Sequence, residues 1–160
     1  MKLYTIQHPY LLDEMKTIGK LISHKEYEMF PDEYTWMKKQ MKTRLNICNP
    51  SDSIIWLWED KPDLRRGGYG ARGTEMILLE VDLEEKYVLC SDFDTWHFVL
   101  NDIEFTKYED EQIEKEESWN RIFDLDFCKS MWNGSKQYLQ YVTGEIPSDR
   151  IKFIRKFKCK

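Results

Sequence analysis

The stretch that most constrains the fold is residues 75–101, EMILLEVDLEEKYVLCSDFDTWHFVLN. It contains two strand-like apolar runs, at residues 75–81 and 87–90. A short helix is expected after them, because Ser91, Asp92 or Asp94 can cap its start and Asn101 can close it. Apolar runs of this kind must bury their faces against other elements. We therefore expect this stretch to be the packing centre of an α+β domain.

Local patterns predict the other elements. Strands are expected at residues 2–6, 53–58, 138–142 and 151–157, and helices at 8–19, 31–46 and around 109–123, with a turn at 132–135. The run SIIWLW at 53–58 is typical of a central strand, and the last two strands are expected to be a hairpin or neighbours, with Ile151, Phe153 and Phe157 on one side. The prediction is a single compact α+β domain over residues 1–160, with two small, mostly antiparallel sheets and flanking helices.

Composition narrows the class of protein. A chain of 160 residues with 41% hydrophobic and 33% charged residues suits one domain with a charged surface. It has no apolar run of the roughly 18 residues that span a bilayer and no apolar signal region at its start, so we expect a cytoplasmic protein without membrane association. The four cysteines and three histidines are scattered, which predicts reduced thiols and no metal site.

Charge is distributed unevenly. The net charge of −5 argues against bulk attraction to nucleic acid, yet residues 109–117 (EDEQIEKEE) are acidic and 150–160 (RIKFIRKFKCK) are basic. The simplest interpretation is two solvated faces of opposite charge that neighbour each other. The alternative is a surface for a charged partner, with the acidic 109–117 face binding a protein.

A glycine-rich connection follows the central strand. Residues 68–73, GYGARG, match G-x-G-x-x-G, but a strand pattern follows them instead of a helix, which excludes the dinucleotide fingerprint. Lys61 and Arg65, with Arg66 and Arg72, could hold the phosphate of a nucleotide or nucleic acid. The alternative is a solvated loop, or one whose cations pair internally with Asp63.

Two further groups are candidates for a site. Asp92, Asp94 and His97 could form a carboxylate and imidazole set for proton transfer, and the alternative is a helix cap with a structural histidine. Aromatic side chains could stack on a base, and the alternative is that they pack in the core. These aromatic candidates are Tyr34, Trp36, Trp56, Trp58 and Trp96.

Two resemblances add to this interpretation. The segments YTWMKKQM, KPDLR, SDFDTWHFVLN and LQYVTGEIPSDRIKFIRKF resemble an uncharacterised bacterial and phage domain family of about this length, which implies no activity. The layout of LYTIQ, the following helix and the final QYLQYVTGEIPSDRIKFI is similar to ADP-ribosyltransferase-like domains. That second resemblance implies NAD bound in a cleft between two sheets and sugar transfer to a protein or nucleic acid.

The sequence departs from the ADP-ribosyltransferase pattern at two positions. The first-strand histidine or arginine is matched by Thr5 or Gln7, and the late glutamate falls on Leu139 or Gln140. A neutral amide supplies neither anionic stabilisation nor a base. Gln140 would then bind ligand without transferase activity, or an acid such as Asp92 or Asp94 would substitute; Glu145 lies close to the expected turn.

Two functions are therefore expected as alternatives. The first is an ADP-ribosyltransferase-like domain that binds NAD or another nucleotide-type ligand through Lys61, Asp63, Arg65 and the aromatic candidates, near the catalytic candidates Asp92, Asp94, His97 and Gln140. The second is a non-catalytic bacterial or phage interaction protein, an inhibitor or conflict factor, that acts through an acidic or aromatic surface.

Overall fold

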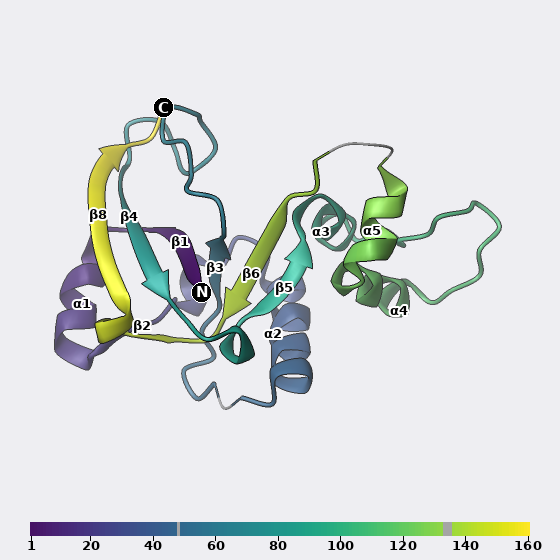
Figure 1. Cartoon of the computed structure of the whole chain (residues 1–160), viewed down its shortest axis with the longest axis horizontal. Helices are drawn as coiled ribbons and strands as arrows, with labels where there is room; N and C mark the ends of the chain where they lie inside the picture. Colours follow the sequence, from purple (N-terminus) through teal and green to yellow (C-terminus); the bar gives the residue numbers. More distant parts are fainter. Residues whose placement is uncertain (48, 133–135) are drawn as a thin grey trace.

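A six-stranded sheet in the order β5-β6-β3-β1-β4-β8 organises the molecule (Figure 1). The structure, a computed structural model, describes residues 1–47, 49–132 and 136–160. All pairings in this sheet are antiparallel, and a second, two-stranded sheet joins β2 to β7. The strands are β1 (Lys2–Gln7), β2 (Lys20–Leu21), β3 (Ile55–Trp58), β4 (Glu75–Asp82), β5 (Leu89–Asp92), β6 (Leu139–Thr143), β7 (Ile146–Pro147) and β8 (Ile151–Lys158). The predicted α+β class with mostly antiparallel sheets is confirmed.

Within the described residues, five α-helices accompany the sheets. They are α1 (Tyr10–Ile18), α2 (Pro31–Leu45), α3 (Phe93–Leu100), α4 (Lys115–Trp119) and α5 (Leu125–Met131), with short 3₁₀ turns η1 (Lys25–Tyr27), η2 (Glu85–Tyr87), η3 (Asn120–Phe123) and η4 (Ser148–Arg150). Gly19 ends α1 with φ 76°, and Asn46 ends α2 with φ 51°. Glycine and asparagine are favoured at these positions because they adopt the left-handed conformation most readily. Of the three candidate caps of α3, Asp92 is the one that caps the helix.

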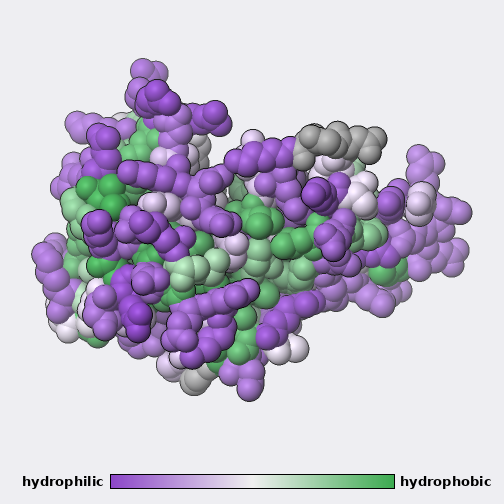
Figure 2. Space-filling view, viewed as in Figure 1, coloured by the Kyte–Doolittle hydropathy of each residue, from purple (hydrophilic) through white to green (hydrophobic). Residues whose placement is uncertain are grey.

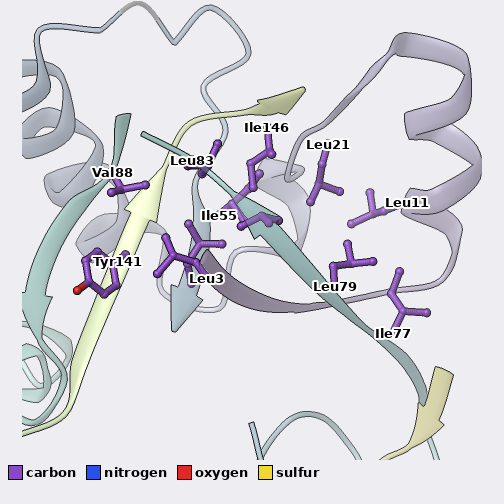
Figure 3. Close-up of a cluster of buried hydrophobic side chains, with 12 residues drawn as sticks. Leu3, Leu11, Leu21, Ile55, Ile77, Leu79, Leu83, Val88, Tyr141 and Ile146 are labelled. Atoms are coloured by element: carbon purple, nitrogen blue, oxygen red, sulfur yellow. The ribbon is translucent and has the colours of Figure 1, made fainter. Parts of the chain in front are cut away.

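The first apolar core lies where the strands of the large sheet meet α1 and the small sheet. Figure 3 shows Leu11, Leu21 and Ile146 close to Leu79 and Ile77 of β4. Because β1 and β4 pair along six residues, their alternate side chains form one continuous face of this core. The core thereby fixes the small sheet, and with it the turn at Gly144 and Glu145, against the large one.

A second core contains four of the six tryptophans. It joins α2, α3, α4 and η3 to the β5 and β6 end of the sheet, and Trp36, Trp96, Phe105 and Trp119 are among its buried members. The helix expected around residues 109–123 is wrong in its first half: α4 begins only at Lys115, and residues 109–114 form no helix. These residues carry acids with only one apolar side chain, so no apolar stripe holds them against the core.

Two expectations about the final strands are also corrected. β6 pairs with β3 and β5, whereas β8 pairs with β4 at the other edge, so the two strands are not neighbours. Phe153 faces Leu79 and Arg155 faces Leu78, which leaves one extra residue on β8 between them. This bulge reverses the side-chain alternation, so Phe153 and Phe157 lie on opposite faces. The expected turn at 132–135 falls largely outside the described residues.

The charged segments lie at opposite ends of the long axis instead of side by side. Figure 1 shows β8 at one end and the connection from α3 to α4, which contains the acidic residues, at the other. In the space-filling view (Figure 2), hydrophilic residues cover most of the end that holds the α3–α4 connection, and hydrophilic and hydrophobic residues are mixed at the β8 end. Among the described residues, no helix is both long enough and apolar enough to span a membrane.

Candidate functional site

The aromatic candidates form part of the second core. The rings of Trp36 and Trp96 stack with centroids 6.4 Å apart, and Trp56 lies 5.1 Å from Trp96 and 5.5 Å from Tyr34. Trp36 and Trp96 are 8% and 4% exposed, so neither offers a free face to a base. Their contacts are those of a packed interior.

The carboxylate and imidazole candidates do not act on one another. Asp92 is fully buried, and its carboxylate accepts hydrogen bonds from the Thr95 N–H at 2.8 Å and from Gln137 Nε2 at 2.9 Å. His97 is exposed and its Nδ1 lies 3.0 Å from the carbonyl oxygen of Phe93. Asp94 is exposed in the first turn of α3. Asp92 is therefore a helix cap, while the His97 ring contacts Phe93 of its own helix.

Gln140 and Arg65 of the basic loop are each hydrogen-bonded to a separate neighbour. Gln140 is 3% exposed, and its Nε2 donates a hydrogen bond to the Ser91 hydroxyl at 3.2 Å. Arg65 is exposed, and its guanidinium donates two hydrogen bonds to the Asp63 carboxylate, with Nε–Oδ1 and Nη2–Oδ2 distances of 2.9 and 3.0 Å. These bonds lower the pKa of Asp63 to about 2. Lys61 is exposed on the same loop.

Three cavities formed by the described residues have none of the nucleotide-site candidates in their lining. These candidates are Lys61, Asp63, Arg65, Asp92, Asp94, His97, Gln140 and the five aromatic residues. The structure brings together Asp63 with Arg65, and Tyr34 with the three tryptophans, but it does not gather the loop, the α3 acids and Gln140 at one site. The acidic segment is similarly engaged with its own surroundings: Glu111 binds the Arg121 guanidinium and accepts from the Lys107 N–H at 3.0 Å.

A different site is formed by the turn between β6 and β7. It is a cavity of about 550 Å³, within the usual range for small-molecule ligands. Its walls come from the end of α2, the connection from β4 to η2, and the β6–β7–η4 segment. The lining residues are Asn46, Ile47, Asp82, Leu83, Glu84, Tyr87, Thr143, Gly144, Glu145, Pro147 and Arg150.

Glu145 is the best-anchored carboxylate on this wall. Its Oε2 accepts from Lys20 Nζ at 2.9 Å and from the Ser51 hydroxyl at 3.1 Å. The side chain is 28% exposed and that of Lys20 is 37% exposed, so both remain within reach of solvent. Gly144 allows this geometry because a Cβ at that position would lie 2.5 Å from Asn49 Oδ1.

Each of the three carboxylates among the described lining residues has a partner cation outside the lining, which leaves the lining cation Arg150 without a partner. Asp82 is matched by the amino group of Met1 at 3.3 Å, and Glu145 by Lys20. Lys86 lies 2.8 Å from Glu84 and holds the pKa of that carboxyl below its usual range, to which Arg150 adds through its charge. The exposed Arg150 guanidinium has no carboxylate within 4.0 Å among the described residues, so it stays open to an anion.

Tyr87 gives the cavity an aromatic wall. Its ring is 42% exposed, and its backbone carbonyl accepts a hydrogen bond from the Thr143 hydroxyl at 2.9 Å, which ties η2 to the end of β6. Lys86 Nζ lies 4.9 Å from the centre of the ring. A half-exposed tyrosine held in this way can stack on a planar ligand.

Sequence reasoning named Glu145 but not Lys20, Ser51, Tyr87 or Arg150. The available signal was the G-E-x-P-x-x-R order at residues 144–150, in which a glycine turn puts an acid and an arginine within one short connection. Metal binding receives no support from the described residues, which contain no cluster of three His, Cys, Asp or Glu side chains.

Comparison with known proteins gives a family without an activity. A family model described as "Domain of unknown function (DUF3841)" matches residues 2–112. This confirms the expected likeness to an uncharacterised domain family. The matched region includes Lys20, Ser51 and Tyr87 but ends before Glu145 and Arg150. No curated protein and no solved structure matches the chain.

Proposed function

We propose that this chain, which belongs to the DUF3841 family, binds a nucleotide-type ligand in the cavity beside Glu145. NAD is the ligand of this class that the resemblance to ADP-ribosyltransferases implies. The observation that carries the proposal is the unmatched Arg150 guanidinium in a cavity of nucleotide size.

Arg150 is the phosphate-binding residue in this proposal. Its planar fork fits phosphate oxygens with two parallel hydrogen bonds, and it need not first break an internal ion pair. The neighbouring cations are already paired: the Met1 amino group with Asp82, Lys86 with Glu84, and Lys20 with Glu145. A single negative group entering the cavity would therefore be drawn to Arg150.

The remaining walls suit the other parts of a nucleotide. The Tyr87 ring offers a plane for a base, and Asn46 adds an amide to the lining. The carboxylate available for chemistry on such a ligand is Glu145, whose orientation is fixed by Lys20 and Ser51. It takes the place that Gln140 and the α3 acids held in the sequence-based hypothesis.

Isothermal titration with NAD, ADP-ribose and AMP tests the ligand class. Arg150→Ala is expected to weaken the affinity by at least about tenfold, the loss of one charge-assisted hydrogen-bonding group. Arg155→Ala is the matched control, because it removes the same charge from a residue that does not line the cavity. Failure of all three compounds to bind the unmodified protein would refute the proposal.

Catalysis is tested separately. NAD cleavage is followed by release of nicotinamide, with the unmodified protein and Glu145→Gln compared at saturating NAD. Loss of turnover with retained binding would assign the chemistry to Glu145. Binding without turnover in the unmodified protein would restrict the function to ligand binding.

A further inference from the structure

Two segments that are far apart in the sequence meet at the C-terminal end of β8. The Gly73 N–H donates to the Cys159 carbonyl at 2.8 Å, and the Cys159 N–H donates to the Thr74 carbonyl at 2.9 Å. The Tyr69 ring lies edge-on to Phe157 at 6.4 Å. The glycine loop of residues 61–73 is thus attached to the edge strand, and both lie beside the C-terminus in Figure 1.

This junction concentrates positive charge in an acidic protein. Residues 61–73 and 150–160 together contain ten Lys and Arg residues against one acid, Asp63, although the whole chain has a net charge of −5. We define the basic edge as Arg65, Arg66, Arg72, Arg155, Lys156, Lys158 and Lys160, all of which are exposed.

Internal carboxylates neutralise only part of the basic edge. Arg65 is bound by Asp63, and Lys156 lies 3.0 Å from Glu75. Four members have no carboxylate within 4.0 Å among residues 1–47, 49–132 and 136–160. These four are Arg72, Arg155, Lys158 and Lys160.

Protection of a sheet edge against aggregation explains lysines on β8 but not the whole arrangement. Edge strands do use lysine to prevent pairing with another chain. Arg72, however, lies on the loop attached to the strand, and the acids of residues 102–117 lie at the other end of the molecule (Figure 1). A surface with one sign of charge attracts a polyanion, and this separation keeps the acids from opposing it.

We propose that the basic edge binds the phosphate backbone of nucleic acid without sequence preference. Backbone binding needs only cations along a surface, whereas reading bases needs side chains that reach base edges. The partly exposed ring of Tyr69 lies on the same loop as Arg72 and can contact a base of a single strand. This interaction does not depend on a ligand in the Glu145 cavity.

Fluorescence anisotropy with a labelled 20-nucleotide oligothymidylate tests the proposal. Neutralising about four phosphates of a single strand predicts a logarithmic salt slope of about −3, so affinity should fall about 50-fold between 50 and 200 mM salt. The variant Arg72→Ala/Arg155→Ala/Lys158→Ala/Lys160→Ala is expected to lose this binding. Circular dichroism verifies that the exposed substitutions leave the fold intact.

The matched control removes the same charge elsewhere. Lys25→Ala/Lys39→Ala/Lys42→Ala/Lys129→Ala changes four exposed lysines that have no carboxylate within 4.0 Å in the described part of the chain, and it should retain binding. Glu145→Gln should also retain it, which separates this proposal from the cavity. Equal loss in the control, equal affinity for polyglutamate, or no salt-dependent binding by the unmodified protein would each overturn the proposal.

Discussion

Replacing Gly144 by alanine tests how closely the wall of the Glu145 cavity is packed. The new Cβ would lie 2.5 Å from Oδ1 and 2.6 Å from Cγ of Asn49, far inside van der Waals contact. Asn49 cannot simply retreat, because its Nδ2 donates a 2.7 Å hydrogen bond to the Ser53 carbonyl. The substitution must therefore either strain the turn or break this bond.

The magnitude follows from those two costs. Overpacking typically costs about 1–3 kcal/mol, and a lost internal hydrogen bond about 1 kcal/mol. We expect Gly144→Ala to lower the free energy of unfolding by about 2 kcal/mol, and Asn49→Ala, which removes the bond alone, by about 1 kcal/mol. In the double variant the clash is absent, so its loss should be about 1 kcal/mol instead of the additive 3.

Urea unfolding followed by tryptophan fluorescence measures all three variants. Gly67→Ala is the control, since its Cβ would lie 3.3 Å from the carbonyl of the terminal Lys160, and its effect should be within about 0.5 kcal/mol. An additive double variant, or a Gly144→Ala variant as stable as the unmodified protein, would refute the packing argument.

Two further predictions concern ionisation. Asp63 should titrate with a pKa of about 2 in carbon-detected NMR, because Arg65 binds its carboxylate. Its stabilisation of the loop is therefore present above its ordinary pKa of about 3.8 and lost as the pH falls towards 2, and Arg65→Ala should raise the pKa towards the ordinary value. Burial raises the pKa of the Cys128 thiol to about 11. Iodoacetamide at pH 8 should therefore modify this thiol only after unfolding in urea, which mass spectrometry can detect. Rapid labelling of the folded protein would contradict the burial of Cys128.

The elements that sequence predicted well are those determined by neighbouring residues. Gly19 and Asn46 end their helices because each takes the left-handed conformation locally, and Asp92 caps α3 through a bond three residues away. The partners of β6 and β8 depend instead on contacts across the whole chain. Neither the separation of these strands nor the bulge between Phe153 and Arg155 has a local signal.

The candidate site shows the same difference between features that neighbouring residues determine and features that depend on contacts across the chain. Residue type drew attention to the tryptophans and to Asp92, but type alone does not tell a ligand contact from a core contact, and the structure buries Trp36, Trp96 and Asp92. The cavity brings Lys20, Ser51 and Glu145 together from three regions of the chain. Only the pairing of β2 with β7 places the first and last of them in contact.

The two proposals use opposite ends of one strand, which makes them independent. Arg150 precedes β8 and faces the cavity, while Lys158 ends the strand on the basic edge. At about 3.3 Å per residue, the strand separates these ends by roughly 23 Å. With a Debye length of about 8 Å at physiological salt, their charges interact by well under about 0.1 kcal/mol. A change at one end that alters binding at the other would therefore require a conformational connection through β8 itself, and the cross-controls Arg155→Ala and Glu145→Gln would detect it.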